Sequence, residues 1–117
     1  MTNPLGAREF EILVTLVAGP KHGYAIMQEL REQGTGGRVL GPGTLYRLLK
    51  ELVTRGWITA VATAGESAGP PRRVYRLTAL GERMVSAEAR RLTALVKRAR
   101  PLLSLSSPTQ RFEPDRR

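Results

Sequence analysis

The chain has 117 residues, of which 41% are hydrophobic and 25% charged, and its formal net charge is +9. This length corresponds to one domain, and a domain this small often gains stability by oligomerising. The absence of cysteine excludes disulfides, thiolate metal sites and a cysteine nucleophile, and the single histidine, His22, leaves little for a histidine-built metal site or a catalytic triad.

Residues 6–18 are predicted to form the first helix. Four apolar residues recur at the i, i+3, i+4, i+7 spacing of one helix face, and we expect them to be buried: Phe10, Leu13, Val14 and Val17. Gly19 and Pro20 end this helix. The N-terminus has no basic stretch followed by an apolar run, so we expect no secretion signal. No apolar run in the chain reaches the ~18–20 residues of a membrane span, and the expected compartment is the cytoplasm.

Residues 22–33 are predicted to form the second helix. Its core-facing residues follow one of two sets with helical spacing, either Tyr24, Met27 and Leu30 or Ile26 and Leu30. Gly34 closes the helix. Residues 34–41 are too rich in glycine for a helix, so they are expected to form a turn.

Residues 43–55 are predicted to form the third helix, with two different faces. Helical spacing places one apolar stripe toward the core: Leu45, Leu48, Leu49 and Leu52. The remaining side chains face water or a partner: Tyr46, Arg47, Lys50, Thr54 and Arg55. Pro42 precedes the helix, Thr44 is expected to cap its first turn, and Gly56 is expected to end it.

Two strands are predicted next, at residues 57–63 and 72–77. Both are rich in β-branched and aromatic residues, and the polar loop between them makes a β-hairpin. In the second strand Val74 and Arg76 share one face, and Arg73, Tyr75 and Leu77 share the other. Trp57 is expected to pack beneath the hairpin.

A long helix is predicted over residues 78–100, capped by Thr78 and ended by Pro101. Apolar residues along it step by three and four, as in a coiled coil, and predict a dimer interface: Val85, Ala89, Leu92, Leu95, Val96 and Ala99. The region 78–103 is therefore assigned to dimerisation. Residues 104–117 contain few apolar groups and are expected to form a disordered tail.

The positive charge is concentrated in two parts of the chain. Residues 1–37 have three basic and four acidic side chains, whereas residues 38–76 have seven basic and two acidic ones. Residues 77–117 have nine basic and four acidic side chains. A cationic middle with few acids suits a polyanion, although a basic surface without a partner gives the same count.

Three helices followed by a β-hairpin make a winged helix-turn-helix over residues 1–77, so the predicted fold is mainly α with a small β-hairpin. A helix fits the major groove of B-DNA, and the hairpin offers a second basic contact. Arg47 and Lys50 lie one turn apart on the outer face of the third helix, where they can reach bases or phosphates. The hydroxyls of Thr44 and Tyr46 lie at its start, where the helix dipole favours anions.

Three segments resemble the family of PadR-like transcriptional regulators, and they occur in order over residues 12–84. They are ILVTLVAGPKHGYAIMQEL, GPGTLYRLLKELVTRGWI and GPPRRVYRLTALGERM. The first resembles the family's Gly-Pro-x-His-Gly-Tyr junction. The second resembles its Gly-Thr-Leu-Tyr recognition helix, and the third resembles its wing.

The resemblance implies a homodimeric repressor that binds an operator in double-stranded DNA through the third helix and the wing. The positions that match the DNA-binding parts of the family are His22, Tyr24, Gly43, Thr44, Tyr46, Arg47, Lys50, Arg72 and Arg73. The family dimerises through its C-terminal helix, and this chain resembles the shorter branch with one such helix. A two-fold dimer predicts an inverted-repeat operator. A small-molecule effector is compatible with the resemblance but is not identified by it.

Several alternatives stand beside these assignments. His22 can be a helix cap or a packing group rather than a ligand, and Tyr24 can belong to the core or contact a phosphate. A winged-helix dimer can also serve as a protein–protein interaction module without specific DNA binding. No paired carboxylates, phosphate loop or nucleophile–base pair can be assembled, so an enzyme is not predicted, and neither is a cofactor or a metal.

Overall fold

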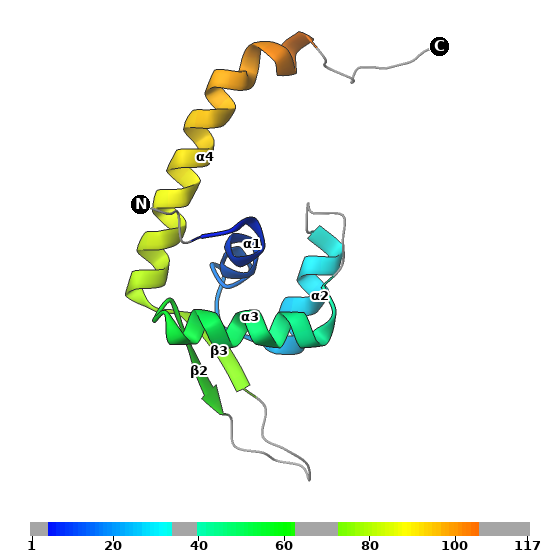
Figure 1. Cartoon of the computed structure of the whole chain (residues 1–117), viewed down its shortest axis with the longest axis vertical. Coiled ribbons are helices and arrows are strands. Elements are labelled where there is room, and N and C mark those ends of the chain that lie inside the picture. Colours follow the sequence, from blue (N-terminus) through cyan, green and yellow to red (C-terminus); the bar gives the residue numbers. More distant parts are fainter. Residues whose placement is uncertain (1–4, 34–39, 63–72, 106–117) are drawn as a thin grey trace, which may run out of the picture. The chain divides into compact units, whose positions relative to one another are not determined.

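The structure is a computed structural model that describes residues 5–33, 40–62 and 73–105 (Figure 1). Its elements in chain order are α1 (Ala7–Thr15), β1 (Lys21–His22), α2 (Gly23–Gln33), α3 (Pro42–Thr54), β2 (Ile58–Ala62), β3 (Arg73–Leu77) and α4 (Ala79–Leu105). The predicted class, mainly α with a small β part, is confirmed. The predicted tail 104–117 lies almost wholly outside the described residues. Among the described helices, none is both long and apolar enough to cross a membrane.

The chain divides into two compact units, residues 1–86 and 87–117, so the boundary falls inside α4. The first unit has one apolar core to which every helix and the sheet contribute. Its buried members are Leu5, Ile12, Leu13, Leu16, Ile26, Met27, Leu45, Leu48, Leu49, Leu52, Trp57, Ile58 and Tyr75. Met84 and Val85 of α4 also pack against this core.

The predicted buried face of α1 is partly wrong. Ile12, Leu13 and Leu16 are buried, whereas Val14 and Val17 are 42% and 61% exposed. Apolar residues occur on more than one side of α1, so periodicity alone does not decide which side meets the core. The helix also ends at Thr15, before Gly19, so the position of Val17 does not follow the helical repeat.

The sheet has three strands rather than the predicted two, in the order β1-β3-β2 with both pairings antiparallel. The unpredicted strand β1 is only two residues long, too short for a pattern of alternation to reveal. Lys21 pairs with Tyr75 and His22 with Val74. The Lys21 Nζ donates to the Thr15 carbonyl at the end of α1 (2.7 Å) and lies 3.6 Å from the Glu29 carboxylate, which ties α1 to α2.

The predicted stripe of α3 is confirmed, since Leu45, Leu48, Leu49 and Leu52 are all buried. Gly56 follows the helix with φ +81°, a conformation that glycine adopts without the steric cost of a Cβ. The predicted cap is wrong: the N-cap residue is Gly41, and it makes no side-chain capping bond. Pro42 is already helical, so Thr44 lies too far inside the helix to cap it.

The start of α4 is fastened to the backbone that follows α3. The Thr78 Oγ1 donates to the Gly56 carbonyl (2.7 Å) and accepts from the Gly81 N–H (2.9 Å), so the predicted cap is confirmed. The Thr78 N–H donates to the Trp57 carbonyl (3.1 Å). Gly81 is buried at this junction, and a Cβ on it would lie 2.0 Å from the Trp57 carbonyl oxygen.

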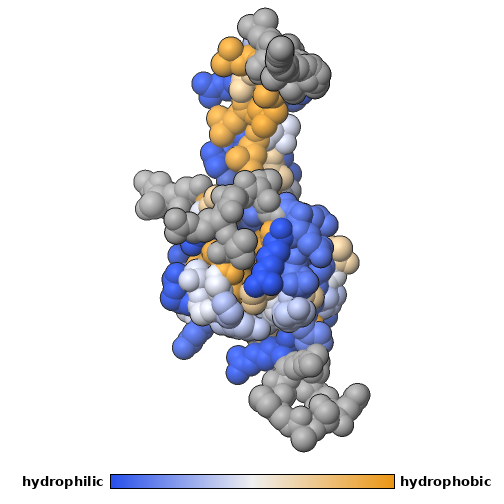
Figure 2. Space-filling model, turned by 90° about the vertical axis from the view of Figure 1, so that its right-hand side faces the viewer, coloured by the Kyte–Doolittle hydropathy of each residue, from blue (hydrophilic) through white to orange (hydrophobic). Residues whose placement is uncertain are grey.

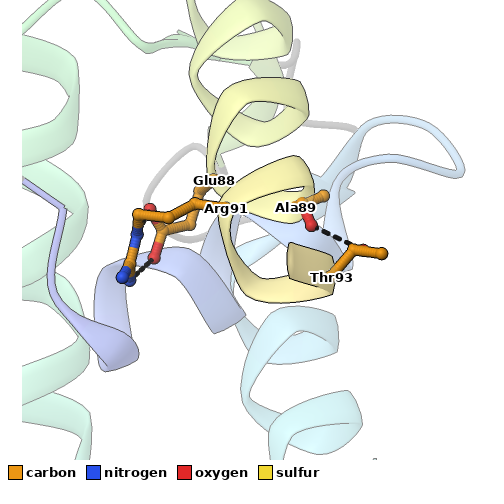
Figure 3. Close-up of polar contacts among 4 residues, drawn as sticks. All are labelled: Glu88, Ala89, Arg91 and Thr93. Carbon is orange, nitrogen blue, oxygen red and sulfur yellow. Dashed lines mark hydrogen bonds and ion pairs between the residues drawn. The ribbon is translucent and has the colours of Figure 1, made fainter. Parts of the chain in front are cut away.

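Within residues 87–105, α4 carries polar contacts on two sides (Figure 3). Arg91 pairs with Glu88 on one side, through Nε at 3.0 Å and Nη2 at 2.5 Å. This hydrogen bond lowers the pKa of Glu88 below its usual range. On the other side the Thr93 Oγ1 donates to the Ala89 carbonyl (2.8 Å).

The predicted end of this helix at Pro101 is wrong, because α4 continues to Leu105 with Pro101 inside it. A proline ring costs one backbone hydrogen bond and bends a helix, but it does not have to end one.

The junction of α4 with Trp57 predicts a large effect of Gly81→Ala. The added methyl group would meet a backbone oxygen that cannot move alone, so we expect a loss of about 3 kcal/mol or more in unfolding free energy. Gly43→Ala in α3 is the matched control, because a Cβ there meets nothing within 4 Å; a gain of about 0.4–1 kcal/mol is expected. Urea unfolding measures both, and equal stabilities for the two variants would contradict the tight junction.

Candidate nucleic-acid interface

The α3 helix has a buried leucine face and an exposed basic face. Arg47 and Lys50 are exposed, and their helical positions lie opposite the stripe formed by Leu45, Leu48, Leu49 and Leu52. Gly43 and Thr54 fall on the same outer side, and both are exposed. The leucines therefore orient the two basic side chains away from the core, as predicted.

The two basic side chains of this face differ in their partners. The Arg47 Nη1 lies 3.2 Å from the Glu51 carboxylate, one turn further along the helix. An exposed i, i+4 pair of this kind contributes only about 0.3–0.5 kcal/mol, so a phosphate can replace Glu51 at low cost. Lys50 is exposed, makes no ion pair within the described residues and is available to an anion.

The start of α3 leaves its backbone accessible. Gly41 and Gly43 are both exposed, and a Cβ at either position would meet nothing within 4 Å. Neither glycine is required by packing or by a positive φ. The N-cap Gly41 makes no side-chain capping bond, and the positive end of a helix dipole suits anions.

The two predicted junction residues, His22 and Tyr24, have different environments. His22 is half-buried on β1, and its Nδ1 is buried with no hydrogen-bond partner among the described residues, so this atom caps no helix. Tyr24 is 66% exposed, so the hypothesis that it belongs to the core is wrong. Its hydroxyl and ring are accessible at the first turn of α2.

The wing contributes exposed arginines from β3. Arg73 and Arg76 are exposed, while Tyr75 between them is buried. Burial raises the pKa of the Tyr75 hydroxyl; Arg73 opposes this rise and Tyr46 adds to it. Arg76 was not among the predicted contacts, although its alternation with Tyr75 indicated an outward position. The predicted contact Arg72 lies outside the described residues.

Two other predicted positions at this interface, Thr44 and Tyr46, lie in the first turns of α3. Thr44 is half-buried. Tyr46 is 46% exposed, and its ring lies against Gly23 at the start of α2. Arg55 makes a cation–π contact with Trp57, since its guanidinium carbon lies 5.1 Å from the indole ring centroid.

The described residues of this interface present exposed cations. Within residues 5–33, 40–62 and 73–105, no group of three or more histidines, cysteines, aspartates or glutamates could hold a metal ion. The basic groups of this interface, Arg47, Lys50, Arg73 and Arg76, come from one helix face and one strand of the same compact unit, and a polyanion is the ligand that such a surface suits.

Comparison with known proteins assigns a family to most of this unit. The model of the transcriptional regulator PadR-like family matches residues 12–87. No curated protein matches the chain. Three solved structures illustrate the likeness in fold. A PadR family transcription regulator from Clostridium difficile is 25% identical with a TM-score of 0.67, over 80% of this chain and 97% of that one.

The other two structures extend this comparison. A PadR family transcriptional regulator from Eggerthella lenta is 26% identical with a TM-score of 0.66, over 83% of this chain and 84% of that one. Bacillus subtilis PadR in complex with operator DNA is 24% identical with a TM-score of 0.64, and the match covers 72% of this chain but only 47% of that one. At that identity the likeness to the Bacillus protein concerns the fold alone.

Proposed function

The chain belongs to the PadR-like family of transcriptional regulators, and from this premise we propose that it is a homodimeric repressor that binds an inverted-repeat operator through α3 and the wing. Membership of this family makes it a transcription regulator rather than an enzyme. The DNA contacts, the dimer and the repressor role are the parts that we propose.

One observation supports DNA binding by α3 above the others. Four buried leucines on one side of the helix leave Arg47 and Lys50 exposed on the opposite side. A helix with this cross-section can enter the major groove while its basic side chains reach phosphates or guanine edges. The Bacillus subtilis relative was solved with operator DNA, which supports duplex DNA as the ligand of this chain as well.

The outer surface of α4 supports a dimer. Large apolar side chains are exposed along it in the single chain: Leu95, Val96, Leu102 and Leu103. Figure 2 shows hydrophobic residues gathered along the second half of this helix. Leu92 is half-buried, and Ala89 and Ala99 are exposed. Val85, predicted at the same interface, packs against the core of its own chain, so we omit it.

A two-fold dimer would present two copies of α3 to successive major grooves, about 34 Å apart. Such a spacing explains why an inverted repeat is the expected operator. A small-molecule effector would act by favouring one angle between the two α4 helices, since a ligand shifts an equilibrium only through its preference for one state. The alternative, a protein–protein module, predicts no salt-dependent binding to DNA.

We expect Arg47→Ala and Lys50→Ala each to weaken binding to an operator selected from randomised duplexes. If the contact is to a base edge the loss is about 1–3 kcal/mol, and if it is to a phosphate the slope of affinity against salt falls by about 0.9. Fluorescence anisotropy at two salt concentrations measures both. Arg31→Ala removes one exposed positive charge from α2 and is the matched control. Full affinity in the Arg47→Ala/Lys50→Ala double variant would contradict the role of α3.

The Gly43→Ala variant is expected to weaken DNA binding without lowering the stability of the free protein. The methyl group meets nothing in the free protein, so the variant should be at least as stable as the parent. On DNA it would stand between the start of α3 and the groove, and we expect affinity to fall about tenfold, the equivalent of one weakened base contact. A variant that binds as tightly as the parent would show that the helix backbone does not approach DNA at this point.

Leu95→Lys/Val96→Lys should convert the dimer to monomers. Both side chains are exposed in the single chain, so the changes should leave its fold intact while placing charges in the proposed interface. Ala94→Lys, on the opposite side of α4, is the control and should remain dimeric. Sedimentation equilibrium measures the mass; a double variant that sediments like the parent would place the dimer interface elsewhere.

A further inference from the structure

Tyr46 and Gly23 form a close contact between α3 and α2 that DNA binding alone does not explain. A Cβ on Gly23 would lie 2.6 Å from the Tyr46 Oη, 2.8 Å from its Cε1 and 3.0 Å from its Cζ. All three of the nearest atoms belong to the Tyr46 side chain. The phenol therefore occupies the space that any other residue at position 23 would need for its side chain.

The glycine is required here by space and not by conformation. Gly23 is the first residue of α2 and is buried, but positive φ values occur only at Gly19 and Gly56 among the described glycines. Without a special φ, alanine would be the better helix former at this position. The observation that accounts for glycine at position 23 is the ring of Tyr46.

Tyr46 also adds to the rise in the pKa of the Tyr75 hydroxyl on β3, a rise whose largest cause is burial. Tyr75 pairs with Lys21 across the sheet. Tyr46 occupies the turn of α3 that also carries Arg47.

We propose that Tyr46 is a positioning residue, whose ring, seated over Gly23, sets the orientation of α3 against α2 and so the angle at which Arg47 and Lys50 meet the DNA. This inference rests on the proposed function. It differs from a direct phosphate contact by the Tyr46 hydroxyl, because the packing of the phenol against Gly23 carries the effect and a hydrogen bond from the hydroxyl to DNA does not.

The test is a double-mutant cycle on the full-length chain, with four variants: Gly23→Ala, Tyr46→Ala, the combination of the two, and Tyr46→Phe. Each is measured for affinity toward the duplex selected with the parent chain and for urea unfolding. Tyr46 is partly exposed, so its ring can swing away from a new methyl group, and Gly23→Ala should remain folded.

We expect Gly23→Ala to weaken DNA binding about tenfold, comparable to the loss of one base contact. Tyr46→Phe should bind within about twofold of the parent. In the Tyr46→Ala background, Gly23→Ala should cause no further loss, because the ring that it displaces is already absent.

Other outcomes overturn the proposal and identify what replaces it. A loss for Tyr46→Phe equal to that for Tyr46→Ala would mean that the hydroxyl contacts DNA directly. An undiminished loss for Gly23→Ala in the Tyr46→Ala background would mean that Gly23 itself approaches DNA. If the parent chain selects no duplex, the proposed function fails and the positioning role fails with it. If the parent binds but the changes in unfolding free energy of Gly23→Ala and Tyr46→Ala are additive, only the Gly23–Tyr46 contact is refuted.

Discussion

The burial of one side of α3 is the constraint on which the rest of the first unit depends. Leu45, Leu49 and Leu52 are completely enclosed, and Leu48 is almost so, within a core that receives side chains from α1, α2 and the sheet. Burying four leucines is worth several kcal/mol, a large part of the net stability of a small domain. A helix held this strongly by one face cannot rotate to hide the other, so its basic side stays in solvent.

Elements whose apolar residues recur at one regular spacing could be predicted from the sequence, and elements without such a spacing could not. In α3 the leucines fall on a single stripe, and the prediction of its two faces was right in every residue. In α1 apolar residues lie on several sides, so the pattern suggested Val14 and Val17 where the core takes Ile12 and Leu16. The strand β1 has two residues and no pattern, and it exists because β3 offers it a free edge.

The residues of the candidate site also divide into those whose positions a sequence pattern predicts and those whose positions it does not. The exposure of Arg47 and Lys50 follows from the leucine stripe, so sequence was sufficient. The position of Tyr46 depends on the lack of a Cβ at Gly23. No local sequence pattern signals a contact between two residues so far apart in the chain. Val85 fits the spacing of the apolar residues that predict the α4 interface. However, it lies one helical turn after the buried Gly81, and there it packs against the core of its own chain.

The α3 helix is held near both of its ends, by Thr78 at one and by Tyr46 at the other. At its C-terminal end the bonds from Thr78 begin only two residues beyond Thr54, and near its N-terminal end the Tyr46 ring rests on α2. A torque on the first turn of α4 would therefore enter α3 at its far end and act about the Tyr46 contact as a pivot. Mechanically, α3 is a lever whose pivot lies next to the exposed Arg47.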